Sequence, residues 1–99
     1  MTDTVVLVVE FTARPDSIDE LRERLLVLVG RTRAEPGCLR YDLHSHRDDS
    51  LRLTFVEEWA SPAAHAAHDE TAWVREIREH LPRLVGDGVR LVRLARLEP

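Results

Sequence analysis

The hydrophobic pattern of this chain changes its period at Glu35-Pro36-Gly37. Before this turn, residues recur at helical spacing and form one stripe, made of Ile18, Leu21, Leu25, Leu28, Val29 and Thr32. Proline disfavours helical geometry in the residue before it, and glycine tolerates a positive φ, so we expect the helix to end here. From Cys38 the residues alternate with the period of two that is typical of a strand.

Patterns of the same two kinds predict the other elements. Residues 4–13 are rich in β-branched side chains and apolar on both faces, which indicates a central strand. A second alternating strand, 51–59, follows turn-forming residues and makes a hairpin with the first. Ser61-Pro62 begins a helical segment that we expect to break near residues 69–71, and residues 89–97 form the last strand. Ser17 and Glu20 have the spacing of a capping box at the start of the first helix.

The order β-α-β-β-α-β predicts an α+β, ferredoxin-like fold, with a four-stranded antiparallel sheet and both helices on one face. At 99 residues we expect a single domain, 1–99. The helix side of the sheet should hold Leu39, Tyr41, Leu43, Leu53, Phe55 and Trp59. The opposite face would expose Val6, Val8, Val56 and Val92 or Leu94. An uncovered apolar sheet centre is unfavourable in water, so we predict a homodimer that packs sheet to sheet.

The composition restricts the classes of binding partner and the cellular compartment that we expect. A formal net charge of −4 argues against binding to nucleic acid or to an anionic membrane. The single cysteine, Cys38, cannot form an intramolecular disulfide, which fits a reducing compartment. The N-terminal stretch MTDTVVLVVEFTA has no basic lead, and its apolar run is too short to span a membrane. We therefore expect a cytoplasmic location.

Two segments, EPGCLRYDLH (35–44) and FVEEWASPAAHAAHDETAW (55–73), resemble the antibiotic biosynthesis monooxygenase (ABM) domain family of small dimeric α+β barrel proteins. The shared features are a Glu-Pro-Gly-Cys turn before a strand with a tyrosine, a Glu-x-Trp at the end of the next strand, and an Ala-His in the following helix. The residues that carry them here are Glu35 to Cys38, Tyr41, Glu57, Trp59, Ala67 and His68. The resemblance covers nearly the whole chain.

The resemblance implies a cofactor-independent monooxygenase that oxidises an aromatic phenol, anthrone or quinol with O₂. In that chemistry the deprotonated substrate is its own electron source, so the protein supplies an apolar pocket, a base and hydrogen bonds to the anion. No cofactor and no metal are implied, and no phosphate-binding glycine-rich loop is visible in the sequence. The expected partners are a small aromatic substrate, O₂ and a second copy of the chain.

The chain also departs from the family's pattern. Quinone-active relatives often read Thr-Pro-His-Phe where this chain has Thr71-Ala72-Trp73-Val74, so Trp73 cannot replace that histidine as a base, although it could line a pocket. The haem-degrading branch uses an asparagine, and this sequence contains none. Haem degradation by that mechanism is therefore not expected.

Among the candidate site residues, His68 is the expected base, because an imidazole titrates near neutral pH. The alternative is a helix histidine that serves packing alone. His65 lies three residues earlier and could share its face, but a metal site would need a further ligand. The expected pocket lining consists of Tyr41, Phe55, Glu57, Trp59 and Trp73, which could equally be core residues.

Glu57 is the most informative member of this set, because an inward-facing carboxylate is unfavourable unless it is paired. Its alternative role is a structural ion pair with an arginine such as Arg93, or one across the dimer. His44 and His46 share a charged strand face, which favours a solvated or dimer-contact surface over a metal site. Two other classes of function stay open: a non-catalytic barrel that binds aromatic ligands or acts in stress response, and a cyclase or isomerase of the same fold.

Overall fold

The computed structural model describes residues 3–99, so Met1 and Thr2 of the N-terminal stretch lie outside it. The elements follow one another as β1 (Val5–Thr12), α1 (Ile18–Thr32), β2 (Cys38–Ser45), β3 (Arg52–Trp59), α2 (Pro62–Asp69), α3 (Ala72–Val85) and β4 (Val89–Leu94). The strands form one antiparallel sheet in the order β2-β3-β1-β4. The predicted ferredoxin-like α+β fold is confirmed, with the second helical segment divided into α2 and α3.

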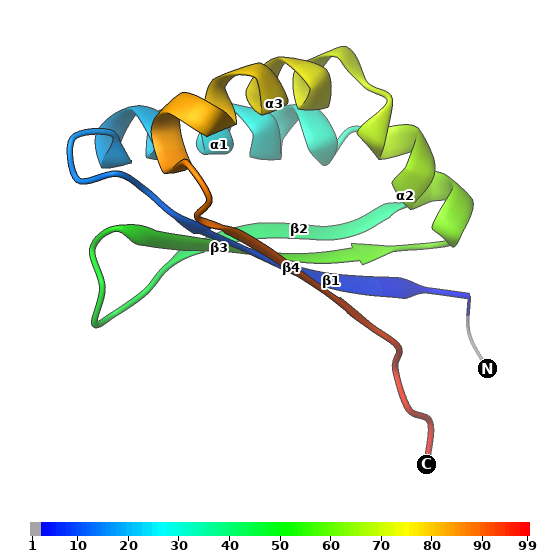
Figure 1. Ribbon diagram of the computed structural model, residues 1–99. Coiled ribbons are helices and arrows are strands. Elements are labelled where there is room, and N and C mark those ends of the chain that lie inside the picture. Colours follow the sequence, from blue (N-terminus) through cyan, green and yellow to red (C-terminus); the bar gives the residue numbers. More distant parts are fainter. Residues whose placement is uncertain (1–2) are drawn as a thin grey trace.

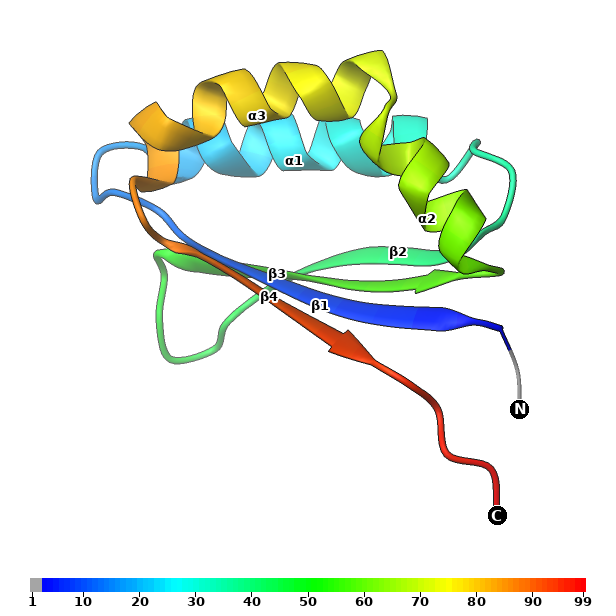
Figure 2. The same cartoon turned by 45° about the vertical axis from the view of Figure 1, so that its right-hand side comes forward.

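The three helices cover one face of the sheet (Figure 1). Helices α1 and α3 lie side by side above the strands, whereas α2 rises steeply at one end, from the end of β3 towards α3 (Figure 2). Strand β4 forms an edge of the sheet, and all six of its residues are exposed. The helical layer therefore leaves the β4 side of the core open.

Helix α1 packs through the predicted stripe, in which Leu21, Leu25, Leu28, Val29 and Thr32 are buried. The predicted capping box is wrong, because the Ser17 side chain accepts no capping hydrogen bond from the helix. Glu20 instead accepts hydrogen bonds from Arg24 at 2.8 Å and from Arg83 of α3 at 2.6 Å. These guanidinium groups lower the pKa of Glu20 to about 2. Two charged partners, one from a distant helix, compete better for this carboxylate than a single backbone N–H.

Strand β2 contains an irregularity that corrects the predicted sheet face. Cys38 pairs with Trp59 and Arg40 pairs with Glu58, so Leu39 is the extra residue of a β-bulge. The prediction that Leu39 lies on the core face is wrong, since Leu39 is 57% exposed. Beyond the bulge, the predicted alternation resumes, and Tyr41 is buried on the helix side together with Leu53, Phe55 and Trp59.

The break between α2 and α3 lies where the sequence predicts it. The Ser61 hydroxyl accepts a hydrogen bond from the Ala64 N–H at 3.1 Å, which caps α2. The Thr71 hydroxyl accepts one from the Val74 N–H at 3.3 Å and caps α3. Two capped starts within one segment let α2 and α3 run in different directions. This change of direction brings α2 down to the sheet and leaves α3 against α1.

The face of the sheet opposite the helices carries a row of valines across three strands. Val8 of β1 pairs with Val56 of β3 and with Val92 of β4. Charged groups flank this row, including Arg52, which lies 3.7 Å from Glu10. Homodimer formation through this face stays a prediction. None of the helices in residues 3–99 is both long and apolar enough to cross a lipid bilayer.

Candidate functional site

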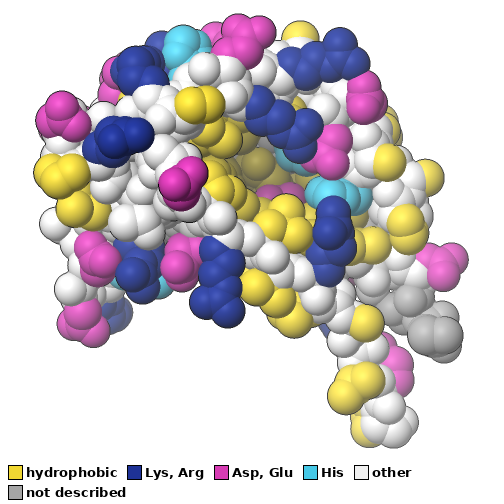
Figure 3. Space-filling model, viewed as in Figure 1, with side chains coloured by type: hydrophobic (Ala, Val, Ile, Leu, Met, Phe, Trp, Pro, Cys, Tyr) yellow, Lys and Arg dark blue, Asp and Glu magenta, His cyan; other side chains and the backbone are white. Residues whose placement is uncertain are grey.

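A hollow lies between the helices and the sheet on the β4 side. Figure 3 shows it as a depression with hydrophobic side chains inside and charged side chains and histidine around it. Its volume is about 150 Å³. Val89 and Leu91, which are 43% and 44% exposed, line its β4 side. The apolar walls also include Val9, Phe11, Leu25, Tyr41, Phe55 and Ile77, and the polar lining residues are Glu57, His65, His68, Asp69 and Arg78.

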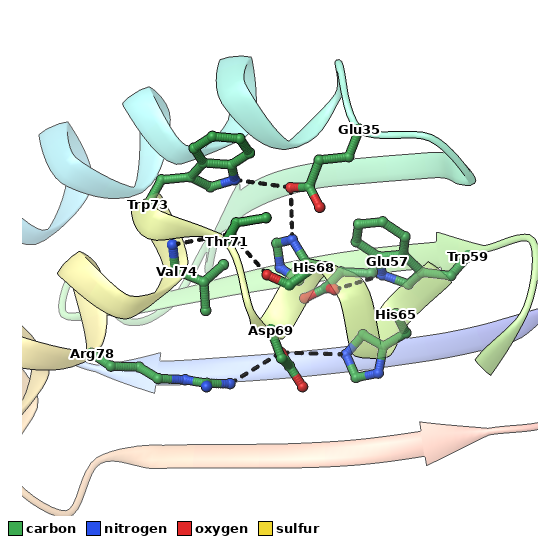
Figure 4. A network of polar contacts seen from close by, with 10 residues as sticks. All are labelled: Glu35, Glu57, Trp59, His65, His68, Asp69, Thr71, Trp73, Val74 and Arg78. Atoms are coloured by element: carbon green, nitrogen blue, oxygen red, sulfur yellow. Dashed lines mark hydrogen bonds and ion pairs between the residues drawn. The ribbon is translucent and has the colours of Figure 1, made fainter. Parts of the chain in front are cut away.

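His68 on α2 and Glu35 on the turn before β2 form a buried pair. The His68 Nδ1 atom lies 2.9 Å from the Glu35 Oε2 atom, and the two side chains are only 5% and 9% exposed. The Trp73 indole N–H donates to the same carboxylate oxygen at 2.9 Å. Figure 4 shows Glu35 between the two rings, with Trp73 reaching it from α3 and His68 from α2. His68 and Trp73, which lie 33 and 38 positions after Glu35 in the sequence, thus both contact its carboxylate.

This arrangement determines which nitrogen of His68 is available for chemistry. A carboxylate only accepts hydrogen bonds, so in the tautomer in which Nδ1 donates to Glu35 the Nε2 atom holds the lone pair of the ring. The imidazole packs against Trp59 at a ring-centroid distance of 4.7 Å and against Tyr41 at 5.4 Å. The ring is therefore oriented by packing on its faces and by a carboxylate at one edge. Such a histidine can act as a general base through Nε2.

A close backbone contact holds Glu35 and α2 together. Gly37 has a φ of +82°, and a Cβ atom added there would lie 2.6 Å from the Cβ of Ala64 on α2. The Ala60 N–H also donates to the Gly37 carbonyl at 2.8 Å. Both the positive φ and the lack of space require glycine at this position. The turn that carries Glu35 is thereby pressed against the helix that carries His68.

Glu57 is a second buried carboxyl group in the hollow, and it is 4% exposed. The Trp59 indole N–H donates to its Oε1 atom at 3.0 Å. Burial raises the pKa of Glu57 to about 7, and the negative charges of Asp69 and Glu35 act in the same direction. The alternative of an ion pair with Arg93 is not observed in residues 3–99, where the structure gives Glu57 no cationic partner. Glu57 is thus mainly neutral below about pH 7.

The remaining polar residues lie towards α3. Asp69 accepts a hydrogen bond from Arg78 at 3.0 Å and lies 3.9 Å from the Nε2 atom of His65. Burial lowers the pKa of His65, with the Asp69 charge opposing this effect. His65 and His68 share a face, as their spacing predicts, with ring centroids 6.2 Å apart. Within the described part of the chain, no three His, Cys, Asp or Glu side chains are arranged to hold a metal ion.

The structure distributes the candidate residues over three places. His68, Tyr41, Phe55 and Glu57 line the hollow together. Trp59 lies behind His68 and binds Glu57, without lining the hollow. Trp73 lines a separate groove between α1 and α3, and its contact with the site runs through Glu35.

The histidines of β2 are not part of this site. His44 contacts the Thr54 carbonyl oxygen at 3.3 Å, and His46 contacts the Thr54 hydroxyl at 2.7 Å and lies 3.7 Å from Glu10. Sequence reasoning did not identify Glu35 or Asp69 as site residues, because their partners are set by the fold. The signal for Glu35 is its place in the Glu-Pro-Gly-Cys turn, which carries the family resemblance and marks the end of a helix but gives Glu35 no partner and no chemical role.

Comparisons with known proteins show the family and the fold of this chain. Residues 4–80 match the profile of the family described as antibiotic biosynthesis monooxygenase. A relative from Mycobacterium tuberculosis, "Putative monooxygenase Rv0793", is 32% identical over 98 residues, covering 99% of this chain and 96% of the relative. The crystal structure of PA3566 from Pseudomonas aeruginosa is 34% identical with a TM-score of 0.93, covering 99% of this chain and 98% of that chain. The structure of Rv0793 has a TM-score of 0.91 and covers 97% of both chains. This chain belongs to the antibiotic biosynthesis monooxygenase family.

Proposed function

We propose that the protein is a cofactor-independent monooxygenase that oxidises an aromatic phenol, anthrone or quinol with O₂. The observation that carries this proposal is the buried Glu35–His68 pair at the wall of an apolar hollow. Family membership supports the monooxygenase class, and the hollow supports a flat, apolar substrate. His68 is the base, and Tyr41, Phe55 and Glu57 contact the substrate.

The first step is a proton transfer. His68 Nε2 removes a proton from the substrate hydroxyl or from its acidic C–H, and the resulting imidazolium is stabilised by the Glu35 carboxylate 2.9 Å from Nδ1. The substrate anion then gives one electron to O₂, and the two radicals combine to form a C–O bond. Return of the proton gives a hydroperoxide, and loss of water from it leaves a quinone. The substrate and O₂ thus supply every atom and electron of the product and the water.

The size of the hollow bears on which substrates to test. A cavity of about 150 Å³ holds a molecule the size of benzene. One aromatic ring therefore fits inside, and further fused rings would extend past Val89 and Leu91 on the β4 side. Tyr41 stays protonated during the reaction, because burial raises its pKa far above neutrality. It offers a neutral hydroxyl and an aromatic ring to the substrate.

The test of this function is O₂ consumption in metal-free buffer with hydroquinone, 1-naphthol and anthrone. We expect the wild type to form the corresponding quinone, and His68→Ala to lose on the order of 10²-fold or more of the rate, as for removal of a general base. His44→Ala is the matched control, since His44 lies outside the hollow, and it should behave as the wild type. Background rates in all three proteins would refute the proposal. Turnover without O₂ would instead indicate an isomerase or cyclase.

We also propose that two copies pair through the valine row of Val8, Val56 and Val92. These residues form a continuous apolar strip across the sheet face that the helices do not cover. Light scattering should give twice the chain mass of 11.4 kDa for the wild type. Val8→Glu places a charge in the centre of the strip and should give a folded monomer. A monomeric wild type would refute the pairing.

A further inference from the structure

The proposed reaction needs a proton donor that His68 does not provide. Loss of water from the hydroperoxide requires a base for the remaining proton and an acid for the departing oxygen. In that step His68 acts as the base again, so a second group has to protonate the oxygen. The polar residues of the hollow that could do so are Tyr41, Glu57, His65, Asp69 and Arg78.

The environments of these groups leave one acid of suitable strength. Burial raises the pKa of Tyr41 far above its usual range, which makes its hydroxyl a weak acid. Burial lowers the pKa of His65, so this ring is mainly neutral at pH 7. Arg78 is not acidic enough, and its guanidinium donates a hydrogen bond to Asp69 at 3.0 Å, which engages the Asp69 carboxylate as an acceptor. Glu57, in contrast, is a buried carboxyl group that keeps its proton up to about pH 7.

The position of Glu57 relative to His68 is set by one side chain. The Trp59 indole N–H donates to Glu57 at 3.0 Å, while the indole ring packs on the His68 imidazole at 4.7 Å. Both acid and base therefore line the same hollow, one from β3 and one from α2 (Figure 4). The titratable and charged groups that surround Glu57 are Glu35, Cys38, Tyr41, His65, His68, Asp69 and Arg78.

We propose that Glu57 is the catalytic acid that protonates the leaving oxygen when the O–O bond of the substrate hydroperoxide breaks. This inference rests on the proposed monooxygenase function. His68 removes the remaining proton from the peroxide-bearing carbon, that electron pair forms the C=O bond, and the O–O bond breaks. The departing oxygen takes the Glu57 proton and leaves as water. The His68 proton then returns to Glu57, which restores both groups.

The decisive variant is Glu57→Gln, which keeps the size of the side chain and an oxygen that can accept the Trp59 hydrogen bond. Each protein is mixed with the substrate that the wild type oxidises fastest among hydroquinone, 1-naphthol and anthrone. Without O₂, Glu57→Gln should form the substrate anion as the wild type does, whereas His68→Ala should not. With O₂, Glu57→Gln should release the uncleaved substrate hydroperoxide and form quinone at least about 10-fold more slowly than the wild type.

Two further variants keep the test independent of folding and local damage. Glu58→Gln changes the neighbouring carboxylate, which points to the other face and contacts Arg96, and should match the wild type. Glu57→Asp retains an acid and should recover part of the quinone yield that Glu57→Gln loses.

In the wild type the quinone yield should decrease above about pH 7, where Glu57 loses its proton. This alkaline decrease should be absent in Glu57→Gln, whose yield is low throughout.

The outcomes separate the two proposals. Normal quinone yield and no peroxide release in Glu57→Gln would overturn the role of Glu57 and leave the monooxygenase function intact. Loss of anion formation without O₂ in Glu57→Gln would also overturn it, because Glu57 would then act in binding or deprotonation. A wild type that oxidises none of the three compounds would overturn both proposals. Peroxide release confined to Glu57→Gln supports the inference.

Discussion

Two buried carboxyl groups of this protein receive a tryptophan indole hydrogen bond, yet their surroundings differ. Glu35 accepts from Trp73 at 2.9 Å, and Glu57 accepts from Trp59 at 3.0 Å. Glu35 also has His68 at 2.9 Å, whereas the described residues give Glu57 no cationic partner. An indole N–H alone does not compensate for the burial of Glu57, since the pKa of Glu57 still rises to about 7. In the proposed reaction, the imidazole partner therefore distinguishes Glu35, which orients His68, from Glu57, which donates a proton.

The largest effect is expected for Glu35→Gln. A glutamine can donate from its amide to the imidazole, which allows the His68 ring to hold its proton on the wrong nitrogen. We expect kcat for the oxidised panel compound to decrease on the order of 10²-fold, with KM little changed. Glu79→Gln, at an exposed position of α3, is the control. A kcat close to that of the wild type would show that Glu35 has no orienting role.

The second prediction concerns the effect of Glu57 on the pH dependence of the free energy of unfolding. The pKa of this carboxyl group is raised from 4.5 to about 7 on folding, so the folded state binds more protons between these pH values. The free energy of unfolding therefore decreases as the pH rises through this window, by up to about 3 kcal/mol. Glu57→Gln lacks this loss. The free energy of unfolding of the variant minus that of the wild type, measured by urea denaturation, should therefore increase from pH 4.5 to pH 8. An equal difference at both pH values would contradict the buried, proton-retaining state.

The third prediction concerns Trp73, whose indole N–H donates a hydrogen bond to Glu35. Trp73→Phe removes one hydrogen bond to a carboxylate, and such bonds contribute about 1.5–3 kcal/mol. We expect a loss of about 2 kcal/mol in unfolding free energy and a lower kcat. In the Glu35→Gln background the same change should have a smaller effect on both, since the two residues are coupled. Strict additivity in this double-mutant cycle would argue that Trp73 acts through packing alone.

The smallest expected effect is on His65, at the edge of the same cluster. Burial lowers the pKa of His65, and the Asp69 charge partly opposes this. Asp69→Asn should therefore lower the pKa of His65 further, as followed by the imidazole proton shifts in an NMR titration. A higher pKa in the variant would mean that the ring is exposed to solvent or contacts another carboxylate.

Most of the fold could be predicted from local patterns. The helix stripe of α1 and the alternation of β3 report burial directly, because each element has one face on the core. The bulge at Leu39 could not be predicted, since Leu39 fits the alternating pattern of the strand and a bulged residue adds no signal of its own to that pattern. The capping box failed for a related reason: Glu20 has the right local spacing, but Arg83 approaches it from 63 positions away.

The site was less accessible to sequence reasoning. His68 and Glu57 could be proposed, because a histidine in a family motif and an inward-facing carboxyl group are visible in one dimension. Glu35 could not be proposed as a site residue, because its partner His68 lies 33 positions later and is brought to it only by the tilt of α2. Trp73 was expected in the pocket, and the break before α3 turns it towards Glu35 instead.

The contact between Gly37 and Ala64 means that two residues without a functional group control the distance between Glu35 and His68. A single methyl group at position 37 would meet the Ala64 Cβ at 2.6 Å and force the turn away from α2. A larger side chain at either position would thus act as a spacer that separates Glu35 from His68 while leaving every reactive atom in the chain. In directed evolution of the proposed monooxygenase activity, inactive variants that keep His68, Glu35 and Glu57 would be expected at these two small residues.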